Sequence, residues 1–332
     1  MNERLISHSE TSALLTCQYR HDFMYGEQLA GTSLKPKHTP PILSDGRAWG
    51  AGVAAYNAGE SLDYAIDTIS DTLTADADRL KHFGTFDQNE FDTSLSLLHG
   101  LLEHYARENE PLGIDRLEHE LIVPIPSRSG KQDSNRYRLQ VFFDGIHVDE
   151  HGRTWLVEFK LRGQLSQLLM IHLSRQIRWY AWAYRKEYGV MPAGIIVDER
   201  LKKLPSEVKL NKNGSVSKVQ SCTVDAYQAA GGDDPEVLQK LTDKKWGIRE
   251  SVPFTDAEID EAGIQLVSAG QQIRSFDAGE TYPVRNPSPL YCNGCQFKDI
   301  CQTPDNTELV DALFERVTPK KDRPNIREEV SA

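Results

Sequence analysis

The most informative pattern of apolar and polar positions lies in residues 141–160, VFFDGIHVDEHGRTWLVEFK. β-Branched and aromatic residues flank the polar group DEHG, which predicts two strands joined by a tight turn near His151. Residues paired across such a turn have numbers that sum to about 302, so Asp144 is expected directly across from Glu158. Lys160 lies two residues further along the second strand and is therefore expected on the same face.

Apolar residues surround these three polar side chains. The hairpin is expected to carry Phe142, Ile146 and Leu156 on their face, and Val141, Phe143, Trp155, Val157 and Phe159 on the other. This pattern predicts a strand pair buried on both sides, where two carboxylates and an amine are costly unless something pairs with them. A shared divalent metal ion would meet that need. On spacing alone, a surface hairpin with a cross-strand Lys–Glu pair remains the alternative.

Two converging carboxylates can hold Mg²⁺ or Mn²⁺, which take oxygen ligands and keep several waters. Such an ion lowers the pKa of a bound water and neutralises charge that develops on a phosphate. Lys160 beside the ion could orient or deprotonate the attacking water, or stabilise the phosphate electrostatically. These are the parts of a phosphodiester hydrolase.

The rest of the chain predicts a mixed sheet with helices packed on it. Helical spacing runs through residues 46–110 apart from a polar interruption at 85–89, which predicts a helical layer over the sheet. Further elements are expected as a helix at 5–30, strands at 117–126, 137–148, 154–161 and 194–198, and helices at 164–188 and 256–276. An Asn-Gly turn predicts an exposed β-arm at 204–219, and the charged residues 319–332 predict a disordered tail.

A chain of 332 residues with 39% hydrophobic content can bury a large core. It has no apolar run long enough to span a membrane and no apolar signal core near residue 1, so we expect a cytoplasmic protein. The net charge of −11 argues against coating duplex DNA through bulk electrostatics but permits a local basic groove. Candidate basic patches lie at Lys202–Lys203, Lys209–Lys218 and Lys244–Lys245.

Three cysteines, Cys292, Cys295 and Cys301, have the spacing C-x2-C-x5-C in a glycine-containing loop. Cys17 is the expected fourth thiolate, on a helix that must then pack near this loop. Four thiolates suit a [4Fe–4S] cluster or a zinc ion, and a triplet completed by one distant cysteine favours iron–sulfur over paired zinc knuckles. Such a cluster would join the two ends of the chain. Cys222 lies outside the pattern and is interpreted as an ordinary thiol.

Gln176 and Tyr180 are one helical turn apart in SRQIRWYAWAY, so both project from one side of the helix after the hairpin. They could hold a DNA phosphate or Lys160, although by themselves an ordinary helix edge with an amphipathic tyrosine explains them better. The chain lacks a G-x4-G-K-[ST] phosphate loop. Any ATP-driven unwinding must therefore come from another protein, such as a separate helicase or recombinase.

Taken in order, these motifs resemble the PD-(D/E)XK nuclease superfamily, and more narrowly its RecB-like branch with an iron–sulfur cluster, which includes CRISPR-associated and phage exonucleases and the AddB-type nuclease domain. The motifs are Cys17, Asp144, Glu158-x-Lys160, Gln176-x3-Tyr180 and Cys292-x2-Cys295-x5-Cys301. The resemblance implies an α/β, restriction-endonuclease-like core with a mixed central sheet flanked by helices. One nuclease domain would span residues 1–318, with a helical part at 46–115, a catalytic core at 116–200 and an iron–sulfur subdomain from 5–30 plus 250–305.

The resemblance also implies metal-dependent hydrolysis of DNA at ends or in single strands, in recombination, repair or phage DNA processing. The setting would be a bacterial cell or a phage-infected host. Asp144 and Glu158 would bind Mg²⁺ or Mn²⁺, and Lys160 would be the catalytic lysine. Gln176 and Tyr180 would form the helical motif of the branch.

One position departs from the family pattern. The family has G-x3-H after the first helix, with the histidine on the metal, whereas Gly46 is followed by Gly50 at the corresponding place. A water could take the missing ligand position. So could Glu120, a candidate supporting carboxylate on the strand before the hairpin, where Glu118 shares its face. The departure leaves a second function open, that of a catalytically weak or inactive DNA-binding or adaptor subunit of a recombination complex.

Overall fold

A six-stranded mixed sheet forms the centre of the computed structural model, which describes residues 3–38 and 41–323. Its strands are β1 (Arg4–Ile6), β3 (Ile114–Pro126), β4 (Asp133–Val148), β5 (Thr154–Arg162), β6 (Gly194–Leu201) and β7 (Gly247–Pro253). The order is β1-β4-β5-β6-β7, with β3 also paired to β4. β1 runs parallel to β4 and β5 parallel to β6, whereas the other neighbours are antiparallel. The mixed central sheet predicted from the sequence is therefore confirmed.

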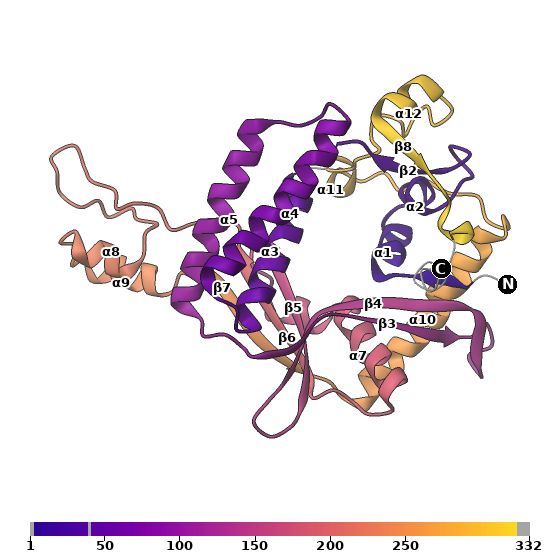
Figure 1. Cartoon of the computed structure of the whole chain (residues 1–332), viewed down its shortest axis with the longest axis horizontal. Coiled ribbons are helices and arrows are strands. Elements are labelled where there is room, and N and C mark those ends of the chain that lie inside the picture. Colours follow the sequence, from indigo (N-terminus) through magenta and orange to yellow (C-terminus); the bar gives the residue numbers. More distant parts are fainter. Residues whose placement is uncertain (1–2, 39–40, 324–332) are drawn as a thin grey trace.

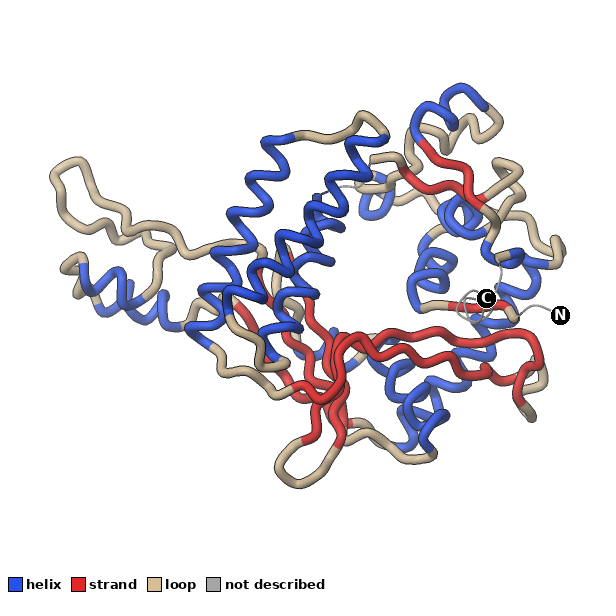
Figure 2. Tube along the Cα trace, viewed as in Figure 1, coloured by secondary structure: helices blue, strands red, loops and turns tan. Residues whose placement is uncertain are grey.

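Helices cover both faces of this sheet (Figures 1 and 2). One layer consists of α3 (Pro41–Asn57), α4 (Leu62–His82) and α5 (Gln88–Glu108). The other consists of α1 (His8–Thr16), α7 (Arg175–Tyr188) and α10 (Asp256–Asp277). Successive strand residues point to opposite faces, so Val157 and Phe159 pack with the first layer and Leu156 with the second.

Local sequence explains where these helices begin. The side chain of Asp87 accepts hydrogen bonds from two backbone N–H groups at the start of α5. Thr255 and Glu258 form a capping box at the start of α10. Each cap satisfies N–H groups that a helix leaves unpaired at its first turn. The polar interruption predicted at 85–89 therefore corresponds to the turn and cap between α4 and α5.

The two ends of the described chain form one unit beside the sheet (Figure 1). It contains α2 (Gln18–Tyr25), β2 (Ser33–Pro36), α11 (Pro289–Cys292), α12 (Thr307–Leu313), β8 (Phe314–Val317) and the 3₁₀ helix η1 (Lys320–Asp322). β2 and β8 pair antiparallel. Phe297 stacks between Phe23 and Phe314 in the core of the unit. Residues from both ends of the sequence thus share one small core.

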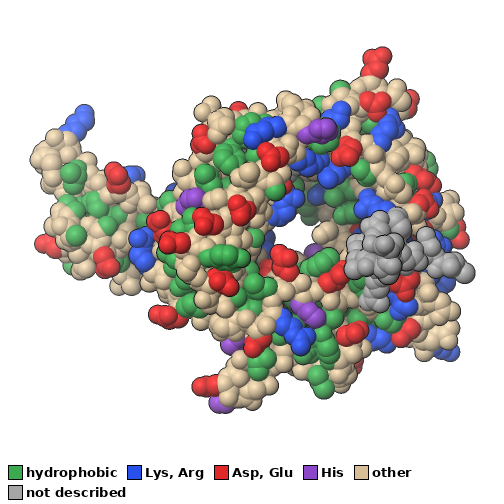
Figure 3. Space-filling model, viewed as in Figure 1, with side chains coloured by type: hydrophobic (Ala, Val, Ile, Leu, Met, Phe, Trp, Pro, Cys, Tyr) green, Lys and Arg blue, Asp and Glu red, His purple; other side chains and the backbone are tan. Residues whose placement is uncertain are grey.

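An opening passes through the molecule between the α3–α5 layer and this terminal unit (Figure 3). Lys and Arg side chains gather along its upper edge, and the long β3–β4 hairpin forms its lower border (Figures 2 and 3). An arm with α8 (Val224–Ala229) and α9 (Pro235–Thr242) projects on the far side of α5 (Figure 1). In residues 3–38 and 41–323, no helix is long and apolar enough to cross a membrane.

Two predicted helices are interrupted. The helix expected at 5–30 breaks at Cys17, whose extended backbone separates α1 from α2. The helix expected at 164–188 is instead a loop, the short α6 (Leu168–His172) and α7. The loop stays out of a helix because the carboxylate of Glu199 binds the backbone N–H and hydroxyl of Ser166.

Two other predictions are wrong in part. The β-arm expected at 204–219 contains one isolated bridge between Leu210 and Val216. The tail expected from residue 319 begins with the ordered η1, because Lys320 Nζ binds the buried Glu10 at 2.9 Å. The rest of that expected tail, residues 324–332, lies outside the described residues.

Candidate functional site

The predicted register of the β4–β5 hairpin is confirmed. The ladder pairs Gly145 with Val157, whose numbers sum to 302, and the same sum holds for its other pairs. The ladder ends there, and Asp144 and Glu158 occupy the next positions. Asp144 Oδ2 accepts the backbone N–H of Phe159 at 2.7 Å. A side chain therefore replaces the backbone pairing, and the two strands separate at the acidic pair.

Phe142 does not lie on a buried face as predicted. Its side chain is 50% exposed. From Asp144 back toward its start, β4 no longer pairs with β5 and is joined only to β3 and β1. The β3–β4 hairpin leaves the helical layers there (Figure 2), so one of its faces is open.

Glu158 is the most enclosed group of the site, with 1% of its surface exposed. Its Oε1 pairs with Lys160 Nζ and accepts a hydrogen bond from Gln176 Nε2 at 2.8 Å. Gln176 Nε2 also donates to the Tyr180 hydroxyl oxygen at 2.8 Å. The structure thus brings together Glu158, Lys160, Gln176 and Tyr180, with Asp144 beside them.

The other carboxylate oxygen of Glu158, Oε2, is buried and has no hydrogen-bond partner among the described residues. A buried acceptor without a partner costs about 1–3 kcal/mol, and more when it is charged. A divalent ion would satisfy this oxygen, and carboxylate oxygens from Glu158 and Asp144 are ligands that Mg²⁺ and Mn²⁺ prefer. No three His, Cys, Asp or Glu side chains in the described part of the chain form a metal-binding group. Waters or substrate oxygens would have to complete the coordination.

The ionisation of the site reflects its burial. Burial raises the pKa of Glu158 to about 7; the charge of Asp144 adds to this shift and Lys160 opposes it. Burial also raises the pKa of Asp144. Burial lowers the pKa of Lys160, but the two carboxylates outweigh it and the net shift is upward. Near neutral pH the site therefore holds a charged lysine beside a carboxyl group that is close to gaining a proton.

Glu120 does not take the place expected of a supporting carboxylate. It is exposed and accepts a hydrogen bond from the Gln140 amide at 2.7 Å. The β3–β4 register instead brings Glu118 across from Asp144. Burial raises the pKa of Asp144 and the charge of Glu118 adds to that shift. Glu118 also has a φ of 44°, and backbone strain of this kind clusters at functional sites. The sequence placed Glu118 and Glu120 on one strand face but held no signal that favours Glu118 over Glu120.

Gly50, the residue that the sequence predicts as the counterpart of the histidine in G-x3-H, lies in α3 next to free space. A Cβ atom built on Gly50 would meet nothing within 4 Å, and the same holds for Gly46 one turn earlier. α3 packs against β5, the strand that carries Glu158. The position could therefore hold a larger side chain without displacing its neighbours.

Glu199 is a site residue that the sequence reasoning missed. It is 1% exposed on β6, the strand next to β5. It accepts hydrogen bonds from the N–H of Ser166 at 2.7 Å, the hydroxyl of Ser166 at 2.8 Å and Arg162 Nε at 3.1 Å. These bonds fix the loop between β5 and α7, and with it the position of Gln176. The available signal was an acidic residue inside the apolar strand GIIVDERL.

The four cysteines of the predicted cluster line one cavity of about 510 Å³. Cys17 comes from the junction of α1 and α2, and Cys292, Cys295 and Cys301 come from α11 and the loop after it. Burial raises the pKa of Cys295, and the thiols of Cys17 and Cys301 add to the shift. All are free thiols. The two chain ends therefore meet as expected, although the thiols do not form a metal-binding group in the described residues.

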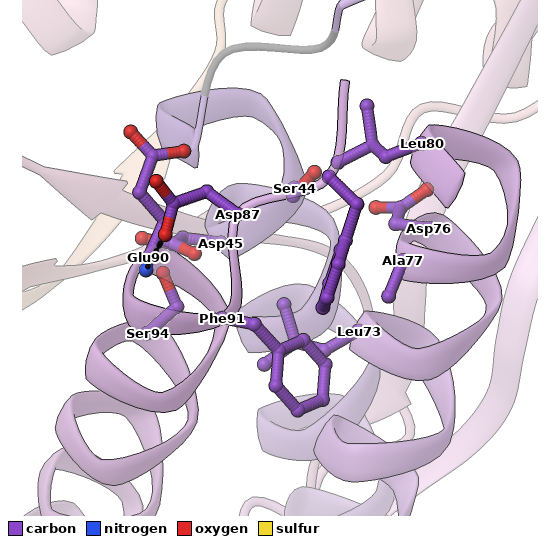
Figure 4. Close-up of a pocket in the computed structure, with 11 residues that line it drawn as sticks. Ser44, Asp45, Leu73, Asp76, Ala77, Leu80, Asp87, Glu90, Phe91 and Ser94 are labelled. Atoms are coloured by element: carbon purple, nitrogen blue, oxygen red, sulfur yellow. Dashed lines mark hydrogen bonds between the residues drawn. The ribbon is translucent and has the colours of Figure 1, made fainter. Parts of the chain in front are cut away.

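A smaller hollow lies among α3, α4 and α5 (Figure 4). Its volume is about 40 Å³, room for little more than a water molecule. Asp76 and Asp45 in its lining already have cationic partners, because Asp76 pairs with Arg47 and the buried Asp45 pairs with Lys202. Lys202, from one of the predicted basic patches, therefore has a structural role here.

Comparison with known proteins identifies a family and solved structures that are similar to this chain. The family model of the PD-(D/E)XK nuclease superfamily matches residues 5–302. A solved structure described as a "putative exonuclease" from Eubacterium rectale has a TM-score of 0.50 and 12% identity, over 99% of this chain and 93% of that one. The structure of SSO0001 is 12% identical over 91% of this chain and 87% of that one, with a TM-score of only 0.35. No curated protein matches. The central mixed sheet flanked by helices fits a restriction-endonuclease-like fold, and the chain belongs to the PD-(D/E)XK nuclease superfamily.

Proposed function

We propose that this protein is a metal-dependent DNA exonuclease that hydrolyses phosphodiester bonds at DNA ends or in single strands. Membership of a nuclease superfamily supports the reaction class and DNA as the substrate. The observation that carries the proposal is the buried carboxylate of Glu158, whose Oε2 has no protein partner in the described residues and which lies beside Asp144 and Lys160. A protein that used this hairpin only for structure would gain nothing from such a group.

Each residue of the site has a separate task in this proposal. Mg²⁺ or Mn²⁺ held by Asp144 and Glu158 would activate water and neutralise charge on the phosphate. Gln176 fixes the orientation of Glu158 through Oε1, and the Tyr180 hydroxyl in turn fixes Gln176. Lys160 is kept protonated by the carboxylates, so it would stabilise a phosphate oxygen by donating hydrogen bonds rather than remove a proton.

The opening through the molecule supports action on ends or single strands. Its upper edge carries Lys and Arg side chains, which attract the phosphate backbone despite the net charge of −11 (Figure 3). A strand can enter a closed opening only from an end. We infer that unwinding would be supplied by a separate helicase or recombinase, in recombination, repair or phage DNA processing.

A cleavage assay tests the proposal. Single-stranded DNA labelled at one end should be degraded with Mg²⁺ or Mn²⁺ and remain intact with EDTA. Glu158→Ala and Lys160→Ala should each reduce cleavage by at least a hundredfold, because they remove a metal ligand and the charge beside the phosphate. Glu150→Ala, an exposed carboxylate in the turn of the same hairpin, is the matched control and should cleave normally. Unchanged cleavage in both site variants would contradict the assignment.

Gly50 favours one alternative, a DNA-binding or adaptor subunit with weak or no hydrolysis, because an imidazole ligand is missing from α3. This alternative predicts that the protein shifts labelled DNA in a gel and leaves it intact with every divalent metal. Cleavage that is lost in Glu158→Ala would rule it out.

We further infer that Cys17, Cys292, Cys295 and Cys301 bind a [4Fe–4S] cluster, as in the RecB-like branch. Support comes from the shared cavity and from the chemistry of a four-thiolate donor set. The cluster would join the terminal unit and contribute to folding. Anaerobically purified protein should be brown, with broad absorption near about 400 nm. Cys17→Ser should lose that absorption, whereas Cys222→Ser should keep it. One zinc per chain without iron would overturn the assignment.

A further inference from the structure

Phe142 is an exposed aromatic side chain beside the acidic pair. It lies on β4 two residues before Asp144, and the alternation of a strand places both side chains on one face. The burial pattern follows this alternation, because Val141 and Phe143 are buried whereas Phe142 is 50% exposed and Asp144 is half-buried. Two residues of a strand span about 7 Å, so the ring lies close to a proposed metal ligand.

The exposure of this ring is unusual for the chain. The structure describes all eleven phenylalanines, and Phe142 is the one that is exposed. Its neighbour Phe143 points to the opposite face and packs edge-on against Tyr180, with ring centroids 5.2 Å apart. The helices α7 and α10 cover that opposite face. The face of Phe142 is therefore left open, on a hairpin that borders the opening through the molecule (Figures 1 and 3).

The charges around the ring determine which part of a DNA strand can lie on it. Glu120 is paired across from Phe142 in the β3–β4 register, Glu118 lies across from Asp144, and both glutamates are exposed. These carboxylates repel a phosphate but not an uncharged base. The cation that acts on Asp144 is Lys160, on β5. A bound strand would therefore direct its phosphate toward Lys160 and a base toward the open face of the hairpin.

We propose that Phe142 stacks on a base of the bound DNA strand, one or two nucleotides from the phosphate that lies at the Asp144–Glu158 pair. The separation of about 7 Å along the strand is close to two steps of about 3.4 Å between stacked nucleotides. Phe142 is thus a positioning residue, which holds the strand while the acidic pair acts on the phosphate. This inference rests on the proposed nuclease function and specifies how the site holds its substrate.

Stacking on Phe142 would also select the form of the DNA. An interior base of a duplex has both of its faces covered by neighbouring bases, so only a terminal or unpaired base can stack on a protein ring. Stacking on an aromatic side chain accepts any base, because every base has a π-face. The site would therefore favour ends and single strands without a preference for sequence.

A binding assay with strands that resist hydrolysis tests the inference. Fluorescence anisotropy with Mg²⁺ compares a phosphorothioate single strand that has all its bases with strands that lack the two terminal bases at either end or two bases in the middle. For wild-type protein, loss of the bases at one end should raise Kd by about tenfold, which corresponds to about 1.4 kcal/mol and is within the range for one stacked base. In Phe142→Ala this end effect should disappear, whereas the effect of the middle bases should be unchanged.

Three further variants separate stacking from other roles. Phe142→Trp should keep the end effect because it retains an aromatic face, whereas Phe142→Leu should lose it because only apolar surface remains. Leu117→Ala is the matched control and should behave as wild type. Leu117 is 42% exposed on the same hairpin and pairs with Gly145, which places it on the face opposite Asp144.

An end effect that is absent in wild type, or that persists in Phe142→Ala or Phe142→Leu, would overturn the inference. Cleavage of ordinary strands with Mg²⁺ or Mn²⁺ is measured separately. If the end effect depends on Phe142 but no strand is cleaved, the stacking site stands and the proposed exonuclease activity fails. If strands are cleaved but the end effect does not depend on Phe142, the activity stands and the stacking site fails.

Discussion

At the scale of single residues, Glu158 needs its negative charge to bind a metal ion, but its burial makes that charge unfavourable. Burial and Asp144 oppose its ionisation, whereas Lys160 favours it, and the resulting pKa is about 7. The hydrogen bond from Gln176 holds one carboxylate oxygen in place. A metal ion binds only the deprotonated carboxylate, so protons and metal compete for this residue close to neutral pH.

This competition predicts how stability depends on pH. Glu158 ionises near its ordinary pKa of 4.5 in the unfolded chain and near 7 in the folded protein. Between these values the folded state binds more protons, so stability falls as pH rises through this window. Urea unfolding in EDTA should show that the free energy of unfolding falls by an amount on the order of 2–3 kcal/mol between about pH 5 and 8. The loss should be absent in Glu158→Gln, and Mg²⁺ should offset it in wild type. A loss of equal size in the variant would contradict the assignment.

At the scale of elements, the end of the β4–β5 ladder decides which helices can reach the site. α7 contributes Gln176 and Tyr180 from one face of the sheet. α3 packs against β5 with the other layer. Because Asp144 replaces the backbone pairing, the two strands separate at Glu158. The resemblance noted from the sequence would place the histidine of a G-x3-H motif on α3, at the position of Gly50.

Introducing a histidine at position 50 tests whether this part of α3 faces the proposed metal site. Gly50→His places an imidazole next to free space and should lower the Mn²⁺ concentration needed for half-maximal cleavage by about tenfold, the effect of one extra ligand of order 1.4 kcal/mol. Gly46→His is the control, because Gly46 lies one turn away and also borders free space. This variant should leave the Mn²⁺ concentration for half-maximal cleavage unchanged. Both variants remove a helix glycine and gain similar helix propensity. Equal metal dependence in the two would show that Gly50 does not correspond to the family histidine.

The sequence predicted those parts of the site that depend on local periodicity. The turn after Val148 and the alternation along the hairpin set the register of Asp144 and Glu158, and a slip of one residue would have buried the wrong face. Glu118 could not be chosen over Glu120 in this way, because its place depends on a strained backbone and on pairing between β3 and β4. Glu199 was missed for a similar reason, since its role depends on a loop that is distant in sequence.

At the scale of the whole molecule, two connections hold the chain ends together. The first is the cavity that Cys17 shares with Cys292, Cys295 and Cys301, a meeting of the two ends that the cysteine spacing predicted. The second is a buried ionic cluster in which Glu10 pairs with Arg4, His21 and Lys320. Arg4 also binds Asp277 at the end of α10. Each of these residues resembles an ordinary surface charge in the sequence, and only folding brings them together.

The ionic cluster should stabilise the protein independently of any iron–sulfur cluster. Glu10 is fully buried, and Lys320 Nζ binds its Oε2 at 2.9 Å. Lys320→Met should lower the free energy of unfolding by about 3 kcal/mol, because a buried carboxylate loses one of its cations. Lys321→Met removes only the more exposed pair with Glu27 and should cost less than about 1 kcal/mol. Urea denaturation of both variants should be compared in the Cys17→Ser background. Equal unfolding midpoints for Lys320→Met and Lys321→Met would show that other contacts hold the terminal unit.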